Sequence, residues 1–142
     1  MRNLLMIFVA CTLINCSGKY ERVSMDRFIG TWELHGRKMF KGIQINIARE
    51  KGKLVGKIQN LNENKYVQML AVVGDTWVSG ISRSSNYQFR LTEKKIGAEL
   101  FSLYGLDTSN ELRAEFIDDN TIGLATGSAD PTESSVIYKR ID

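Results

Sequence analysis

Hydrophobic and polar residues alternate in short runs along most of the chain after residue 28. Ile43, Ile45 and Ile47, for example, are separated by polar or small residues, which is the period of a half-buried β-strand. Turn-forming residues such as Gly52 and the Gly74–Asp75 pair stand between successive runs. The pattern predicts strands over residues 31–35, 43–47, 54–59, 66–73, 76–82, 87–91, 97–104, 112–116, 121–126 and 134–141.

This spacing indicates an all-β domain. Short strands separated by turn signals at intervals of roughly 8–12 residues are typical of a sandwich or a barrel. Consecutive hairpins favour an up-and-down meander, and closing the meander removes exposed strand edges. We therefore expect a single up-and-down antiparallel β-barrel of about 8–10 strands over residues 28–142, with a sandwich as the less favoured alternative.

The N-terminal segment has a different composition. Arg2 is followed by an uncharged run over residues 4–14, which as a helix would reach about 16 Å, against about 30 Å for the hydrocarbon core of a bilayer. A basic start followed by a short apolar run is the arrangement of a secretory signal. We assign residues 1–15 to a signal peptide and residues 16–27 to a short tether and entry turn, in which Ser24 caps a single helical turn.

The end of this segment resembles the bacterial lipobox, at which a lipoprotein signal is cut and the following cysteine is acylated. Leu13 stands three residues before the cleavage point and Cys16 follows it, whereas Asn15 replaces the usual small residue. The resemblance implies a palmitate-type anchor on Cys16 in the bilayer of a bacterial cell envelope, and Ser17 favours the outer membrane. A signal peptide with an incidental cysteine and a lipobox ending at Cys11 are the alternatives.

Composition narrows the function further. The chain of 142 residues has a net charge of +3, which offers no support for a nucleic-acid partner. It contains two cysteines, Cys11 and Cys16, so removal of residues 1–15 would leave no internal disulfide. The sequence has two short basic clusters, Lys94–Lys95 and the one around Arg37 and Lys38. They are explained by solvated turns or by contact with anionic lipid head groups.

A short motif sharpens the expected barrel. Gly30 and Trp32 form a Gly-x-Trp sequence after an aromatic residue, and the last predicted strand carries Arg140. This combination resembles the signature of lipocalins and related calycin barrels. The resemblance implies that Trp32 plugs one end of the barrel and that Arg140 stacks on its indole face, so these three residues are structural. We therefore expect a small lipocalin-like domain.

Catalytic chemistry finds little support in the sequence. His35 is the single histidine, and no cysteine nucleophile would remain beside it after removal of the signal. The acidic turns lack the spacing of a calcium loop, and there is no glycine-rich phosphate loop. We expect a protein that is not an enzyme and that uses neither a metal nor a cofactor.

Two binding functions remain. The first is a barrel that holds a small hydrophobic or amphipathic ligand, for which strand alternation selects inward residues. These candidates are Tyr66, Leu70, Trp77, Ile81, Tyr87, Phe89, Leu100 and Tyr104. The second is a periplasmic protein-interaction module, such as an inhibitor or immunity protein, with a filled core and recognition loops at residues 82–86 or 105–110.

Overall fold

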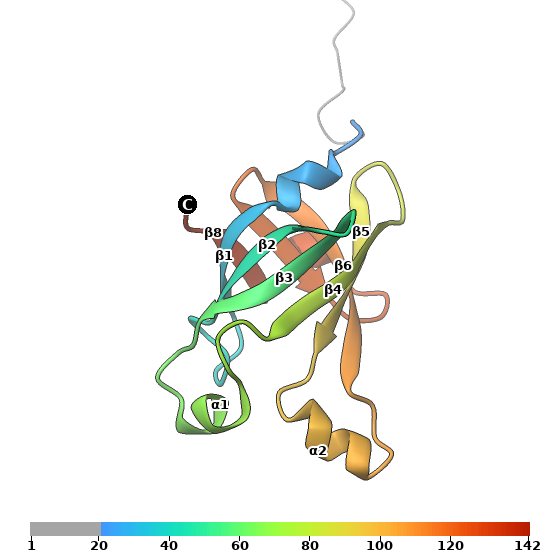
Figure 1. Cartoon of the computed structure of the whole chain (residues 1–142). Helices are drawn as coiled ribbons and strands as arrows, with labels where there is room; N and C mark the ends of the chain where they lie inside the picture. Colours follow the sequence, from blue (N-terminus) through green and yellow to red (C-terminus); the bar gives the residue numbers. More distant parts are fainter. Residues whose placement is uncertain (1–20) are drawn as a thin grey trace, which may run out of the picture.

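The computed structural model describes residues 21–142, so the predicted signal peptide and Cys16 lie outside the described residues. Eight antiparallel strands form a closed barrel in chain order, β1-β2-β3-β4-β5-β6-β7-β8, as Figure 1 shows. The strands are β1 (Gly30–His35), β2 (Gln44–Glu50), β3 (Lys53–Asn60), β4 (Thr76–Arg83), β5 (Gln88–Lys94), β6 (Ser109–Asp118), β7 (Thr121–Ala125) and β8 (Ile137–Arg140). The up-and-down barrel expected from the alternation is therefore confirmed.

Two of the predicted strands are wrong. Residues 66–73 and 97–104 instead contain the short helices α1 (Lys65–Leu70) and α2 (Ala98–Leu103). Asn64 begins α1 by accepting hydrogen bonds from the backbone N–H groups of Tyr66 and Val67, as an N-terminal capping residue does. The last strand is also shorter than predicted, because β8 spans Ile137–Arg140 and not residues 134–141; the 3-10 turn η2 (Pro131–Glu133) precedes it.

The two ends of the barrel differ. Tight hairpins join β2 to β3 and β6 to β7 at one end, next to the 3-10 turn η1 (Met25–Phe28). The β1–β2 loop, α1, α2 and η2 all lie at the opposite end, which we call the mouth (Figure 1). The chain enters the described part at Glu21 on the η1 side, which we call the closed end.

Aromatic side chains fill the closed end. Phe28 is fully buried and its ring centroid lies 4.9 Å from that of Phe89 and 4.9 Å from that of Phe116. The indole N–H of Trp32 donates to the carbonyl oxygen of Phe28 at 2.8 Å, which ties β1 to η1. Ser24 accepts from the backbone N–H of Asp26, as expected for the cap of this turn.

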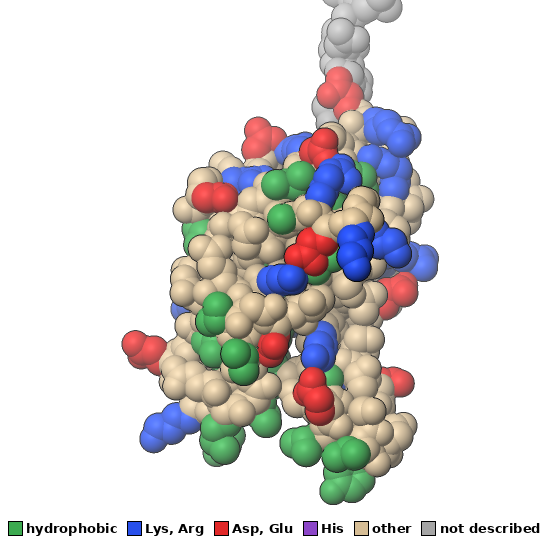
Figure 2. Space-filling view, viewed as in Figure 1, with side chains coloured by type: hydrophobic (Ala, Val, Ile, Leu, Met, Phe, Trp, Pro, Cys, Tyr) green, Lys and Arg blue, Asp and Glu red, His purple; other side chains and the backbone are tan. Residues whose placement is uncertain are grey.

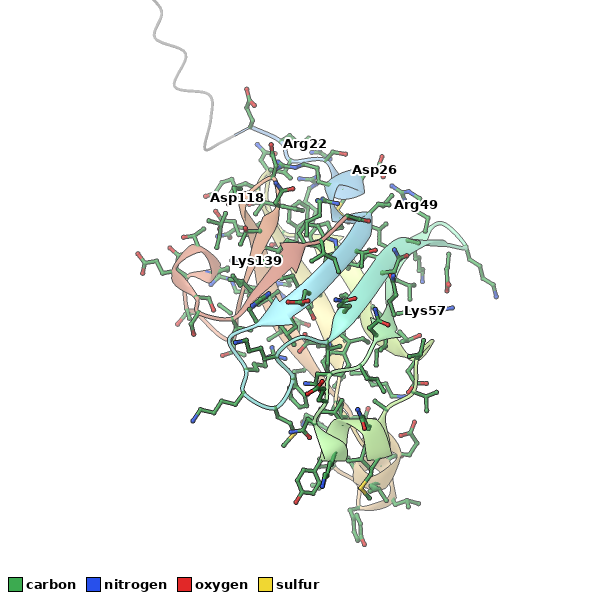
Figure 3. All side chains as sticks on the ribbon, turned by 90° about the vertical axis from the view of Figure 1, so that its left-hand side faces the viewer. Arg22, Asp26, Arg49, Lys57, Asp118 and Lys139 are labelled. Atoms are coloured by element: carbon green, nitrogen blue, oxygen red, sulfur yellow. The ribbon has the colours of Figure 1, made fainter. Side chains whose placement is uncertain are left out.

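Charged residues cover the outside of the barrel. In Figure 3 the labelled side chains of Arg49, Lys57 and Lys139 project from its outer face, and that of Asp26 projects from η1. Asp26 pairs with Arg49, and the ammonium of Lys57 lies 2.6 Å from a carboxylate oxygen of Glu50. Within residues 21–142, no buried side-chain nitrogen or oxygen lacks a hydrogen-bond partner. Three polar residues in this part of the chain are buried nonetheless, namely Thr31, Glu93 and Glu115.

Candidate binding site at the mouth of the barrel

A cavity of about 410 Å³ opens at the mouth between α1, α2 and the β1–β2 loop. This volume falls within the range of about 300–1,000 Å³ that is typical of small-molecule sites. Most of the lining is apolar or aromatic, with a few polar groups. The lining residues are Arg37, Met39, Phe40, Tyr66, Leu70, Trp77, Glu93, Lys94, Lys95, Ile96, Phe101 and Asn110.

Trp77 and Phe40 form an aromatic wall of this mouth cavity. Their ring centroids are 5.7 Å apart at an interplanar angle of 70°, an edge-to-face arrangement. Trp77 is 3% exposed and stands near the start of β4, whereas Phe40 comes from the β1–β2 loop. The wall therefore joins a rigid strand to a loop at the rim.

A buried polar cluster lies where the cavity meets the barrel core. Glu93 is 2% exposed, and each of its two carboxylate oxygens has a partner. Oε1 accepts from the hydroxyl of Tyr138 and from the indole N–H of Trp77, the latter at 3.2 Å. Oε2 is paired with the guanidinium of Arg37. Three donors thus compensate one buried carboxylate, as a charge in this position requires.

The hydroxyl of Tyr138 is fully buried beside the carboxylate of Glu93. Burial raises the pKa of its hydroxyl well above the ordinary value, and the negative charge of Glu93 raises it further. The same hydroxyl accepts a hydrogen bond from the indole N–H of Trp77 at 2.9 Å. Trp77, Tyr138 and Glu93 therefore hold one another at a fixed position on β4, β8 and β5.

Arg37 is the least constrained member of the cluster. Its side chain is 25% exposed, and it stands on the β1–β2 loop rather than on a strand. Besides the mouth cavity, it lines a second cavity of about 570 Å³, whose other walls include Leu112, Leu124 and Val136. Arg37 therefore lies between two cavities at the mouth and contributes to the lining of both.

The basic residues at the rim are already engaged with neighbours. The ammonium of Lys94 lies 3.0 Å from a carboxylate oxygen of Glu99, and hydrogen bonds from the backbone and from Lys94 lower the pKa of that carboxyl. The ammonium of Lys95 lies 5.6 Å from the ring centroid of Phe101, a cation–π contact.

Of the eight residues selected by strand alternation, three line the mouth cavity and five do not. Tyr66, Leu70 and Trp77 line the mouth cavity, although Tyr66 and Leu70 stand on α1 and not on a strand. Leu100 and Tyr104 are exposed beside or within α2 and do not line this cavity, because the predicted strand there is a helix.

The other three candidates lie towards the closed end. Phe89 is fully buried among the aromatic side chains around Phe28, so it belongs to the packed core. Ile81 is half-buried on β4, and Tyr87 lies between β4 and β5. The structure does not bring these three residues to the mouth cavity.

Glu93, Tyr138 and Arg37 are site residues that the sequence analysis missed. A signal for Glu93 was present, because it continues the alternation of Phe89 and Leu91, and both of those residues face the core. Tyr138 likewise shares the parity of Arg140 on β8. Arg37 comes from a loop whose path no periodicity predicts.

The other features considered in the sequence are a lone histidine, possible metal ligands and a membrane-spanning helix. Nε2 of His35 lies 3.0 Å from a carboxylate oxygen of Glu33, and both side chains are partly exposed. Among residues 21–142, His, Cys, Asp and Glu side chains form no group of three that could hold a metal ion. None of the helices in this part of the chain is long and apolar enough to cross a bilayer.

Comparison with known proteins adds no relative. No protein-family model, no curated protein and no solved structure matches the chain.

Proposed function

We propose that the protein is a lipid-anchored, lipocalin-like binding protein of the bacterial cell envelope. Its barrel would hold a small apolar or amphipathic molecule in the mouth cavity and would carry out no catalysis. The observation that supports this most strongly is the cavity of about 410 Å³, with its aromatic wall and its buried polar cluster. A mainly apolar lining with a few well-placed polar groups is the usual composition of a small-ligand site.

The anchor rests on the lipobox-like sequence before Cys16. Several acyl chains, at about 0.8 kcal/mol per buried CH₂, would hold the protein on a membrane effectively permanently. Because the described chain begins at Glu21 beside the closed end, such an anchor would attach the barrel by that end. The mouth would then face away from the anchoring membrane, where a ligand can reach it.

The anchor is tested by metabolic labelling with an alkyne analogue of palmitate in a bacterial expression host. The wild-type chain and the Cys11→Ala variant should both be labelled and recovered with membranes, whereas Cys16→Ala should be unlabelled. Labelling that survives in Cys16→Ala and is lost in Cys11→Ala would move the anchor to the alternative cysteine. Absence of label in all three proteins would remove the lipoprotein part of the proposal.

Ligand binding is tested with residues 17–142 and the neutral apolar fluorophore N-phenyl-1-naphthylamine. Leu70 is 43% exposed at the cavity wall, so Leu70→Trp should place an indole in the cavity and weaken binding by about tenfold or more. The matched control is Leu103→Trp on α2, where Leu103 is 81% exposed and does not line the cavity. Saturable binding that Leu70→Trp leaves unchanged would place the ligand elsewhere.

A second function, the periplasmic protein-interaction module, is favoured by a different observation. Large apolar side chains are exposed on the two helical segments at the mouth, and Figure 2 shows them gathered at that end of the molecule. They are Tyr66, Met69, Leu70, Val72, Val73, Leu100, Leu103, Tyr104 and Leu106. Exposed apolar groups that gather at one place often mark a contact surface.

This second function is tested by photocrosslinking in cells, with the crosslinking residue at position 103 and, as a control, at Lys53 near the closed end. A discrete protein adduct from position 103 alone would support an interaction module. Loss of that adduct on Tyr104→Asp would assign the contact to α2. Adducts of equal intensity from both positions, or from neither, would argue against a specific partner at the mouth.

A further inference from the structure

We infer that the mouth cavity selects amphipathic ligands with a cationic head group, which takes the place of Arg37 at the carboxylate of Glu93. The inference rests on the proposed ligand-binding function and specifies its ligand class. The ligand would be an amine, amidine or guanidine with an apolar chain or ring, seated against Trp77, Phe40 and Ile96. Nothing in the inference requires a covalent step.

The carboxylate of Glu93 is a fixed acceptor. Two of its donors, Trp77 and Tyr138, stand on strands and bind Oε1, so the carboxylate cannot turn away from the cavity without breaking both hydrogen bonds. Oε2 is left for a third donor, and in the structure that donor is a guanidinium. The position is therefore already shaped for a cation with N–H groups, and a charge-assisted hydrogen bond there is stronger than a neutral one.

Arg37 is the replaceable partner. It is one-quarter exposed while Glu93 is almost fully buried, and it reaches the carboxylate from the β1–β2 loop. If the guanidinium swings into solvent, it regains water, whereas Glu93 stays inside and needs a new positive partner. A cationic ligand supplies that partner, and its departure lets Arg37 return. Arg37 therefore acts as a built-in competitor for the ligand head group.

An anionic head group fits the inner site less well. It would meet the carboxylate of Glu93 in a poorly hydrated place, and the single positive charge of Arg37 would balance only one of the two negative charges. The other cations that line the cavity are at the rim, where Lys94 is paired with Glu99 and Lys95 lies on Phe101. A carboxylate held at that rim is the competing arrangement, and the experiment below distinguishes it.

The test is calorimetric titration of residues 17–142 with three probes of equal chain length, octylamine, octanoate and 1-octanol, at pH 7. We expect octylamine to bind at least tenfold more tightly than octanoate. Glu93→Gln should remove that preference, whereas the matched control Glu99→Gln, which deletes a rim carboxylate, should keep it. Arg37→Met should tighten octylamine by about tenfold, because the competitor is gone, and Lys38→Met should not.

The outcomes separate this inference from the function it rests on. Tighter binding of octanoate, weakened by Arg37→Met, would overturn the cationic head group and still support a ligand-binding barrel. Equal binding of all three probes would also overturn it, leaving an apolar site without head-group selection. Binding of none of them would contradict the proposed function itself. If Glu93→Gln does not fold, Tyr138→Phe, which removes one donor from the same carboxylate, should change the octylamine affinity and leave that of 1-octanol unchanged.

Discussion

The guanidinium carbon of Arg140 on β8 lies 4.2 Å from the ring centroid of Trp32 on β1. These two residues are direct partners in the pairing of the two strands. The same guanidinium donates to the carbonyl oxygens of Ile29 at 2.9 Å and Arg27 at 2.7 Å. One side chain therefore stacks on the indole of β1 and caps the end of η1. This contact joins the last strand to the first and closes the barrel over its aromatic core.

Arg140→Met should destabilise the fold by about 1–3 kcal/mol, since it removes a cation–π contact and two charge-assisted hydrogen bonds. Urea denaturation followed by tryptophan fluorescence measures this change. The matched control is Lys139→Met, because Lys139 is exposed on the outer face of the same strand. Equal losses for the two variants would mean that the stacking contributes nothing specific.

Gly30→Ala tests why glycine precedes Trp32 in the motif. Gly30 has a φ of +139°, and a Cβ built there would lie 2.4 Å from Nη1 of Arg140. Gly52 also has a positive φ, of +78°, but a Cβ at that position would meet nothing within 4 Å. We expect Gly30→Ala to cost more free energy of unfolding than Gly52→Ala, whose backbone strain alone is about 1–2 kcal/mol. An equal or smaller loss for Gly30→Ala would refute the close approach to Arg140.

The buried hydroxyl of Tyr138 predicts a loss of stability in alkali. Burial and Glu93 raise its pKa above the value of about 10 for an exposed tyrosine, so the folded state keeps a proton that the unfolded state releases. The stabilisation is complete below pH 10 and is lost as the pH rises from there towards the folded pKa. Urea midpoints from pH 8 to 11 should fall less steeply in Tyr138→Phe than in the exposed control Tyr104→Phe. Parallel slopes would contradict the raised pKa.

Substituting an exposed leucine should change the free energy of unfolding much less than substituting a buried one. Leu103 is 81% exposed on α2, so Leu103→Ser should change stability by no more than about 0.5 kcal/mol while lowering the binding of a hydrophobic surface dye. Leu34 is fully buried on β1, and Leu34→Ala should cost about 2–5 kcal/mol. A large stability loss for Leu103→Ser would mean that α2 packs against something in solution.

Much of the barrel could be predicted because its strands carry the period of a sheet with one face in the core. The contact between Trp32 and Arg140 was also expected, from the Gly-x-Trp motif and the arginine in the last strand. The structure shows the two residues paired across β1 and β8. The helices α1 and α2 could not be predicted in this way. Each spans six residues and buries a single side chain, Val67 or Ala98, so neither displays an apolar stripe at helical period.

The candidate site was harder to predict than the fold. A charged residue at the end of a strand is ordinarily solvated, and only the tertiary partners of Glu93 explain its burial. Those partners, Trp77, Tyr138 and Arg37, come from three distant segments. The mouth cavity likewise depends on two short helices that the pattern assigns to strands, which is why Leu100 and Tyr104 were misplaced.

A small ligand in the mouth cavity should affect the two tryptophans differently. Trp77 lines the cavity, whereas Trp32 is fully buried at the closed end. Protein labelled with ¹⁵N at tryptophan can be titrated separately with octylamine, octanoate and 1-octanol while the two indole N–H signals are followed by NMR. We expect the Trp77 signal to shift saturably with at least one of these ligands while the Trp32 signal stays in place. Two unmoved signals up to the solubility limit of all three ligands would rule out a ligand site at the mouth.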